Sequence, residues 1–164
     1  MEQKEKVYKE LDRLGINYQV MEHPAVYTIN EMEALEIFLD NPWIVKNLFL
    51  RDASGRRHFL VTLDMNKRVD LKELRQQLGT SGLSFASEER LMKYLELTKG
   101  SVTPLGILND GELAVEVVFD SSLVGRDRIG IHPNDNTATV MLRYEDLEKI
   151  IREHGNPIHI IDIS

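Results

Sequence analysis

Hydrophobic residues along this chain recur with two periods, and the switching between the periods predicts a domain built from both helices and strands. Val7, Leu11 and Leu14 recur at helical spacing, and Gly15 is placed to end that helix. Apolar and polar residues then alternate over 16–20, as they do in a half-buried strand. The pattern therefore predicts a helix followed by a strand at the start of the chain.

Capping residues predict the further helices. A capping box, in which a threonine is followed three residues later by a glutamate, opens a helix over 28–39. Asp70 is placed to cap a helix that Gly79 ends, Ser87 is placed to cap the next one, and the last helix ends at Gly155. In the helix that follows Ser87, we expect three side chains to face inward: Leu91, Met92 and Leu95.

Two hairpins and two single strands complete the pattern. Turn residues at 52–55 and at 109–111 separate apolar runs, which is typical of hairpins. The strands are expected at 46–52 with 57–63, at 105–108 with 113–119, at 137–142 and at 158–163. Hairpins form antiparallel pairs, and helical connections permit parallel ones. We therefore predict an α+β fold with a mixed sheet, in one domain over 1–164.

The composition limits the available chemistry. A chain of 164 residues with 42% apolar content suits a single core. No apolar run approaches the roughly 20 residues that span a bilayer, and the charged N-terminal segment lacks the apolar stretch of a secretory signal, so we expect a cytoplasmic protein. The absence of cysteine excludes disulfides, thiolate metal ligands and a cysteine nucleophile. Because no spacing of His, Asp and Glu suggests a metal site either, we expect no metal and no cofactor.

One basic segment interrupts an acidic chain. The net charge is −7, but residues 46–75 carry eight Lys and Arg side chains against four Asp and Glu. A solvated hairpin and helix face explains this cluster about as well as a nucleic-acid contact does. Five of its members are the candidates for such a contact: Arg51, Arg56, Arg57, Lys67 and Arg68.

Two segments carry candidate chemistry. Lys46 begins an apolar strand, on the same face as Leu48 and Leu50. Residues 100–104 form a loop whose closely spaced N–H groups can hold a polar ligand, and in which Gly100 can adopt backbone angles closed to other residues. Taken alone, the lysine fits a strand-edge residue with its charge in solvent, and the loop fits an ordinary turn.

The five histidines differ in their surroundings. His132 lies in the segment Gly-Ile-His-Pro and is the candidate for a functional role, and His23 also precedes a proline. The other three, His58, His154 and His159, are expected on strand or helix surfaces. By its residue type alone, His132 fits a structural histidine better, because a lone histidine is usually structural.

Five segments occur in an order that a known family shares. They are KNLFLRD at 46–52, RHFLV at 57–61, LSFAS at 83–87, GSVTP at 100–104, and IHP at 131–133 followed by NTAT at 136–139. This order resembles the YbaK/prolyl-tRNA-synthetase-associated domain family, specifically its free-standing prolyl-tRNA editing branch. The resemblance covers roughly residues 1–142.

The resemblance implies a fold and an activity. The fold would be a mixed, partly closed sheet flanked by helices. The activity would be metal-independent trans-editing, in which alanine or another small wrong amino acid is hydrolysed from tRNA for proline. The acceptor end of aminoacylated tRNA would be the partner, and prolyl-tRNA synthetase is a second candidate. Such editing answers a physical problem, since a pocket built for proline gains only about 1–3 kcal/mol of discrimination per missing methylene, whereas a second, smaller pocket excludes proline by size.

The same resemblance implies the site residues. Lys46 would be needed for deacylation, by binding the terminal adenosine or a phosphate or by stabilising negative charge on the ester carbonyl. We favour such positioning over proton transfer, because a lysine is normally charged at neutral pH. Gly100 and His132 would join it as catalytic residues, and no general base is assigned. The expected substrate-binding residues are Asn47, Ser101, Val102, Thr103, Pro104, Gly130, Asn136 and Thr137.

One departure from the family leaves the amino acid open. Many editing proteins of this branch approach the lysine through small residues, whereas this chain has Asn-Pro-Trp-Ile-Val at 41–45. Trp43 is either a core residue or one that reshapes the mouth of the pocket, so serine, threonine and cysteine esters remain candidates beside alanine. A non-catalytic tRNA- or synthetase-binding module of the same fold is the alternative from another class, and a general small-ester hydrolase is the third. The oligomeric state is not predicted.

Overall fold

The computed structural model describes residues 2–25, 30–31, 34 and 43–163. The helices are α1 (Gln3–Arg13), α3 (Leu71–Leu78), α4 (Glu88–Leu95) and α5 (Tyr144–His154), with short 3₁₀ helices η1 (Lys99–Ser101), η2 (Pro104–Asn109) and η3 (Ser121–Leu123). The strands are β1 (Gln19–Glu22), β2 (Trp43–Arg51), β3 (His58–Asp64), β4 (Ser84–Phe85), β5 (Val115–Asp120), β6 (Ile129–Ile131), β7 (Ala138–Leu142) and β8 (Ile158–Ile161).

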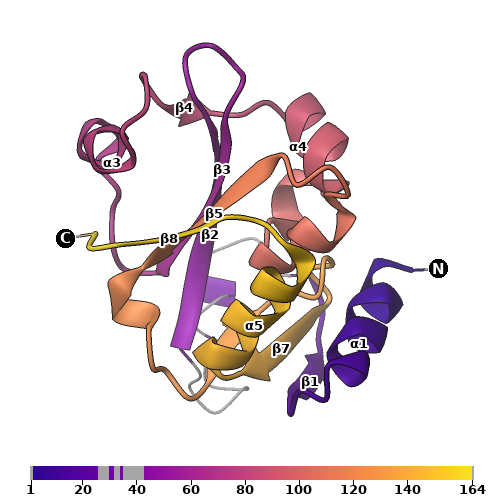
Figure 1. Cartoon of the computed structure of the whole chain (residues 1–164). Helices are drawn as coiled ribbons and strands as arrows, with labels where there is room; N and C mark the ends of the chain where they lie inside the picture. Colours follow the sequence, from indigo (N-terminus) through magenta and orange to yellow (C-terminus); the bar gives the residue numbers. More distant parts are fainter. Residues whose placement is uncertain (1, 26–29, 32–33, 35–42, 164) are drawn as a thin grey trace.

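These strands form one mixed sheet. Its order is β1-β7-β6-β2-β3-β5-β8, and β4 pairs with β2 outside this path. In Figure 1, α3 lies on one side of the molecule and α1, α4 and α5 lie on the other. The predicted α+β class, with a mixed sheet flanked by helices, is confirmed. No helix in the described part of the chain is long and apolar enough to cross a membrane.

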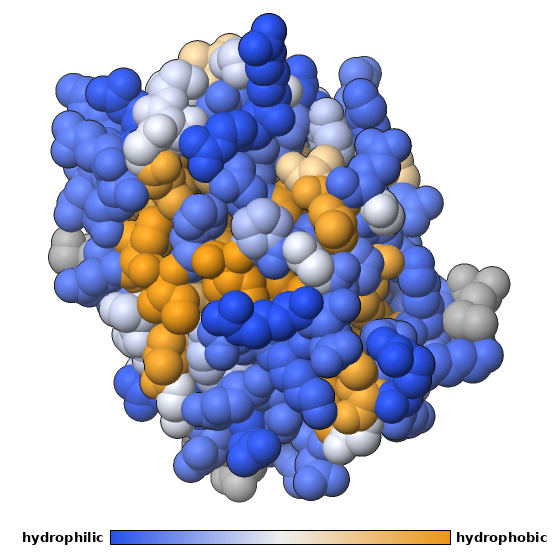
Figure 2. All heavy atoms as spheres, in the orientation of Figure 1, coloured by the Kyte–Doolittle hydropathy of each residue, from blue (hydrophilic) through white to orange (hydrophobic). Residues whose placement is uncertain are grey.

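Two hydrophobic clusters lie on the two faces of the sheet, because successive side chains of a strand point to opposite faces. Val45 and Phe49 of β2 join the main cluster, together with residues of α1, α4 and α5. Leu50 of the same strand joins the smaller cluster, which includes Leu74 of α3. The face shown in Figure 2 is mostly hydrophilic, with hydrophobic side chains gathered around β8, where Ile160 is 48% exposed.

The helix ends follow the predicted caps. The Asp70 carboxylate accepts hydrogen bonds from the N–H groups of Lys72 and Glu73 at the start of α3, and Gly79 ends that helix with a left-handed φ of 64°. The Ser87 hydroxyl accepts from the N–H of Arg90 at the start of α4. Each cap satisfies donors that the first turn of a helix leaves without a partner.

The second predicted hairpin is wrong. Its first strand is replaced by the 3₁₀ helix η2. The carboxylate of Asp110 is buried, and it accepts hydrogen bonds from the N–H groups of Ala114 and Val115 and from Nδ2 of Asn156. The turn residues at 109–111 therefore anchor the start of β5 instead of reversing the chain between two paired strands.

Two further expectations about helices need comment. Met92 is 49% exposed, so the prediction that it faces inward is wrong, and only Leu91 and Leu95, four residues apart, carry the buried stripe of α4. The helix predicted over 28–39 lies mostly outside the described residues. Trp43 packs against the main cluster as a core residue, with the Arg126 guanidinium 3.8 Å from its ring centroid.

Strand β2 positions the site because its two edges are paired differently. Along one edge, β3 pairs with seven consecutive residues. Along the other edge, β6 pairs only with Trp43 and Ile44, and β4 pairs only with Leu50 and Arg51. Residues 45–48 lie between these two short pairings, with no other described strand beside them on that edge. The sheet is therefore split along one side of β2.

Candidate active site

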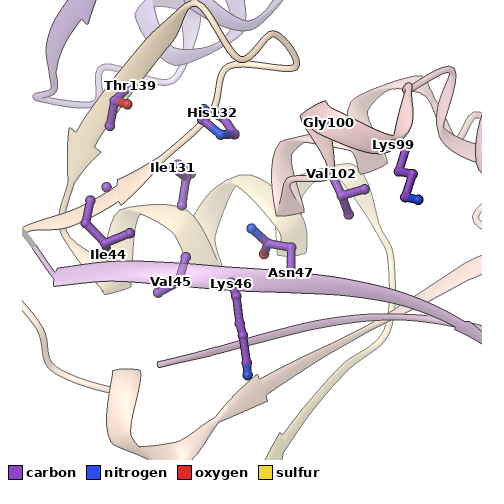
Figure 3. A pocket seen from close by; sticks show the side chains of 11 residues that line it. Ile44, Val45, Lys46, Asn47, Lys99, Gly100, Val102, Ile131, His132 and Thr139 are labelled. Carbon is purple, nitrogen blue, oxygen red and sulfur yellow. The ribbon is translucent and has the colours of Figure 1, made fainter. Parts of the chain in front are cut away.

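A cavity of about 190 Å³ lies at this split, and Figure 3 shows the residues around it. Its walls come from the start of β2, from β6 and the residue that follows it, from β7, and from the segment around η1. The apolar part of the wall consists of Ile44, Val45, Val102 and Ile131. The polar residues of the wall are Lys46, Asn47, Lys99, His132 and Thr139.

The fold brings three of the predicted segments together at this cavity. Among the described residues, six of those predicted from the resemblance line it: Lys46, Asn47, Gly100, Val102, Gly130 and His132. Ser101, Thr103 and Pro104 are buried behind the wall, and neither Asn136 nor Thr137 lines the cavity. Lining the cavity does not by itself test the chemical role of any of these residues.

The loop at 100–104 supports the wall in a way that differs from the prediction. Gly100 lies inside the right-handed turn η1, so the expectation that it adopts backbone angles closed to other residues is wrong. The hydroxyl of Thr103 donates a hydrogen bond of 2.7 Å to the backbone carbonyl of His132. Thr103 therefore ties the loop to the strand end that carries the histidine.

His132 presents one nitrogen to the cavity. Its Nδ1 lies 3.1 Å from the backbone carbonyl oxygen of Ala138, and because a carbonyl only accepts, Nδ1 carries the proton. Burial lowers the pKa of His132 below its ordinary value of 6.5, and nearby His23 lowers it as well, against an opposing effect of the bond to Ala138. The ring is therefore neutral at neutral pH, and Nε2 is left as a hydrogen-bond acceptor.

The carboxamide of Asn47 is oriented by a neighbouring strand. The hydroxyl of the fully buried Thr62 on β3 donates a hydrogen bond of 2.7 Å to Oδ1 of Asn47. This bond assigns the oxygen to the β3 side, and in Figure 3 the Nδ2 end points toward the cavity. Asn47 therefore offers amide donors to a ligand, with their direction set by Thr62.

The backbone of Asn47 faces the same opening. The N–H of Trp43 bonds to Arg128 beside β6, and the C=O of Phe49 accepts from the N–H of Ala86 beside β4. Every second residue of a strand turns its N–H and C=O to the same edge, so those of Asn47 turn to this edge too. Because neither β6 nor β4 reaches Asn47, its backbone groups are placed to bind a substrate.

Lys46 lies differently. Its backbone lines the cavity, but in Figure 3 its side chain points away from Asn47 and His132, as expected for adjacent residues of a strand. The ammonium makes no hydrogen bond or ion pair with the other residues that the structure describes. In this arrangement the charge does not face the cavity, so of the roles implied by the resemblance, contact with a phosphate fits the geometry better than stabilisation of charge on the ester.

Sequence reasoning missed three polar residues near the cavity. Thr139 lines it, and its hydroxyl donates to Nε2 of His23 over 2.8 Å, while Nδ1 of His23 donates to the carbonyl of Pro24. Lys99 is exposed at the cavity rim. The signals were present, since Thr139 closes the matched NTAT segment and Lys99 directly precedes the loop. Within the described ranges, no three His, Asp or Glu side chains gather as a metal site.

Two of the five basic candidates have carboxylate partners inside the molecule. The Lys67 ammonium lies 2.8 Å from the buried carboxylate of Asp120 and 2.7 Å from the carbonyl of Ile163. Arg57 makes two hydrogen bonds of 2.9 Å to the carboxylate of Glu116. These contacts give both cations a structural role. Arg51 bonds to nearby backbone carbonyls, while Arg56 and Arg68 are exposed, so nucleic-acid contacts by these residues stay predictions.

Comparison with known proteins identifies relatives of this chain. The family described as "Aminoacyl-tRNA editing domain" matches residues 23–150. A protein of Acetoanaerobium sticklandii named prolyl-tRNA editing protein ProX is 56% identical over 164 residues, 99% of each chain. The prolyl-tRNA synthetase associated domain-containing protein 1 of Mus musculus is 33% identical over 159 residues, 94% of this chain and 92% of that one.

A solved structure shares the fold. It is described as a candidate trans-editing enzyme for prolyl tRNA synthetase, and it superposes with a TM-score of 0.74 at 20% identity, covering 100% of this chain and 98% of the other. The family match and the relatives confirm the resemblance found in the sequence, and the solved structure confirms the fold. The chain belongs to the aminoacyl-tRNA editing domain family and is an aminoacyl-tRNA hydrolase of that family.

Proposed function

We propose that the cavity holds the aminoacyl group of alanine esterified to tRNA for proline, and that the protein hydrolyses this ester. The observation that carries the proposal is the size of the cavity together with the polar groups at its wall. Its volume of about 190 Å³ is below the roughly 300–1,000 Å³ of sites for drug-sized ligands, which suits one small amino acid. The similarity to a protein named for prolyl-tRNA editing supports the choice of tRNA.

The apolar wall supplies the selection by size. Ile44 and Ile131 are at most 9% exposed and stand on paired strands, so the wall yields little to a larger ligand. We expect the methyl group of alanine to fit against such a wall and the larger proline ring to be held off by it. We expect selection to come from this exclusion, since direct contacts with a single methyl group contribute little.

Asn47 and His132 supply the chemistry in this proposal. The ester carbonyl oxygen lies at the amide donors of Asn47, which stabilise the negative charge that forms on it. The neutral His132 accepts a hydrogen bond at Nε2 from the attacking water or from the free ribose hydroxyl, and so positions it. Water adds to the carbonyl carbon, the bond to the ribose oxygen breaks, and that oxygen takes up a proton as the amino acid leaves. This route needs no covalent enzyme intermediate.

Single-turnover hydrolysis tests the proposal. Purified protein in excess is mixed with alanyl-tRNA for proline, with prolyl-tRNA for proline as the matched control, and release of the amino acid is followed. Rapid release of alanine with prolyl-tRNA left intact is the expected result. Cleavage of seryl-, threonyl- or cysteinyl-tRNA instead would correct the amino acid, and tight binding without any cleavage would favour the non-catalytic binding module.

A further inference from the structure

The hydroxyl of Thr139 has a fixed direction at the wall of the active-site cavity. Thr139 is 2% exposed, and its Oγ1 lies 2.8 Å from Nε2 of His23. On the other side of that ring, Nδ1 lies 2.8 Å from the backbone carbonyl oxygen of Pro24. A carbonyl only accepts, so Nδ1 carries the proton of the neutral ring and Nε2 accepts the proton of Thr139. The hydroxyl proton is therefore held by His23, which does not line the cavity.

What Thr139 offers to the cavity is an acceptor. A hydroxyl carries two lone pairs beside its single proton. Within the described ranges, no residue other than His23 forms a hydrogen bond with Oγ1 of Thr139. Because the proton is already donated, the lone pairs are what remains for a ligand. Thr139 is thus prepared to receive a hydrogen-bond donor.

The pairing of β6 with β7 places this acceptor beside His132. Ile131 pairs with Val140, and the antiparallel register extended by one residue sets His132 opposite Thr139. Side chains opposite each other in an antiparallel pair lie on the same face, with Cβ atoms about 4.5–5.5 Å apart. Both residues line the cavity, and Figure 3 shows them across it from β2. Two acceptors, Nε2 of His132 and Oγ1 of Thr139, therefore stand side by side on one wall.

The two acceptors suit two different donors of an aminoacyl ester. The attacking water or ribose hydroxyl has to release a proton, and the imidazole of His132 is a far stronger base than a hydroxyl. The α-amino group keeps its protons during hydrolysis and needs only an acceptor. Among the residues that the structure describes, no Asp or Glu lines the cavity, so a neutral oxygen has to meet this amino group. Thr139 supplies such an oxygen next to the histidine.

We propose that Thr139 binds the α-amino group of the aminoacyl ester, and that His23 is a positioning residue that turns the lone pairs of Thr139 toward the substrate. The inference rests on the proposed function, in that the aminoacyl group is placed in this cavity. It defines the substrate class more closely, as esters whose acid carries a free α-amino group. An acid of the same size without that group leaves the buried acceptor unpaired and binds more weakly.

A binding experiment with hydrolysis-resistant probes tests the inference without turnover. The probes are tRNA for proline ending in 3′-amino-3′-deoxyadenosine, acylated through an amide bond with alanine or with propionic acid. Propionic acid is alanine without its amino group, so the two probes differ only there. The dissociation constants of both are measured for the wild-type protein, for Thr139→Val and for Thr139→Ser. Valine keeps the shape of threonine without the hydroxyl, and serine keeps the hydroxyl.

We expect the amino group to matter only when the hydroxyl is present. The wild-type protein should bind the alanyl probe about tenfold more tightly than the propionyl probe, in line with one hydrogen bond to a charged group. Thr139→Val should bind both probes equally, and Thr139→Ser should keep the preference. A structural role for Thr139 would weaken both probes by the same factor. That result, or a preference in the wild type that Thr139→Val retains, would overturn the inference.

His23→Leu tests the positioning role separately. Without Nε2 the hydroxyl of Thr139 has no fixed acceptor, and its proton is free to turn into the cavity toward the amino group. We expect the preference for the alanyl probe to fall several-fold, with the affinity for the propionyl probe unchanged. An intact preference in His23→Leu would show that His23 does not direct the hydroxyl.

The hydrolysis assay separates this inference from the proposed function. If the wild-type protein cleaves alanyl-tRNA but binds the two probes equally, the role of Thr139 is wrong and the editing activity stands. If the alanyl probe is preferred through Thr139 but no alanyl-tRNA is cleaved, the amino-group site stands and the proposed hydrolysis fails.

Discussion

His58 and His132 are both buried enough to have a lowered pKa, but their surroundings differ. The His58 ring is 1% exposed and lies between Phe49 and Tyr94, with ring centroids 5.6 and 4.1 Å away. Its Nε2 lies 3.0 Å from the Arg90 guanidinium, which can only donate, so this nitrogen is an acceptor already in use. Burial, then the charges of Arg90 and Arg51, lower the pKa of His58 to about 4.

His132 differs in having one nitrogen left for a ligand. Its Nδ1 is bound to the Ala138 carbonyl, while the residue lines a cavity beside Asn47. A lowered pKa therefore accompanies both a closed structural cluster and a candidate catalytic group. What distinguishes the two histidines is an unused lone pair at a cavity. The expectation that His58 lies on a strand surface is wrong, because β3 is an interior strand between β2 and β5.

The largest expected effect is on catalysis at His132. Replacement of His132 by Gln removes the Nε2 acceptor, and we expect the single-turnover rate of deacylation to fall at least about 100-fold, within the range for a positioned acid or base group. The free energy of unfolding should change little. His159→Gln is the matched control, since His159 on β8 contacts Glu116 on β5 and does not line the cavity. An unchanged rate in His132→Gln would remove this histidine from the chemistry.

The next largest effect is on stability at His58. The unfolded protein takes up a proton on this residue near pH 6.5, whereas the folded protein does so only near pH 4. As the pH falls between these values the unfolded state is favoured, and we expect a loss of roughly 3 kcal/mol in the free energy of unfolding, which then levels off below pH 4. Urea unfolding from pH 7.5 to 4 measures it.

His58→Phe provides the comparison for that series. Phenylalanine does not titrate, so the variant should lack this part of the pH dependence whatever its absolute stability. If wild type and variant lose stability in parallel over this range, other groups account for the pH dependence, and His58 would not be the sealed histidine that its contacts indicate.

A smaller effect is expected at Thr62, which orients the amide of Asn47. Thr62→Val keeps the shape but removes the hydroxyl donor, so the carboxamide loses the bond that sets its direction. We expect about a tenfold lower single-turnover rate at saturating protein, with tRNA binding unchanged, in line with the loss of one hydrogen bond. Thr62→Ser, which retains the donor, should keep most of the activity. Equal losses in both variants would point to packing rather than orientation.

The smallest expected effect is at Lys46. Because its ammonium points away from the cavity, we expect Lys46→Ala to weaken tRNA binding a few-fold and to make the slope of log K against log salt shallower by about 0.7–0.9, as for one lost phosphate contact. The rate at saturating protein should stay near that of the wild type. A large fall in that rate would show that the side chain turns into the cavity when substrate binds.

Prediction from sequence worked where local chemistry decides the structure. The caps at Asp70 and Ser87 were recognisable because a side chain satisfies backbone donors two or three residues away. The strands β4 and β6 were not predicted, since segments of two and three residues carry no period of their own. They are strands because longer strands pair with them: β4 pairs with β2, and β6 pairs with both β2 and β7.

The candidate site shows the same division. Lys46, Gly100 and His132 were identified through a shared order of motifs, which carries no direction for a side chain. The orientation of Asn47 depends on Thr62 from another strand, and His23 reaches the site through Thr139. Such contacts join residues far apart in the chain, so no local pattern announces them.

By itself, the sequence determined the capped helices, the long strands and the family of this protein, because caps, apolar periods and ordered motifs act over a few residues. Only the tertiary structure decided that His58 is sealed and that His132 faces a cavity. It also decided which side of β2 carries the amide donors of Asn47. His58 is sealed because β3 is an interior strand, and the cavity exists because two short strands leave the middle of one edge of β2 unpaired. Both depend on strand neighbours that exist only after the sheet has formed.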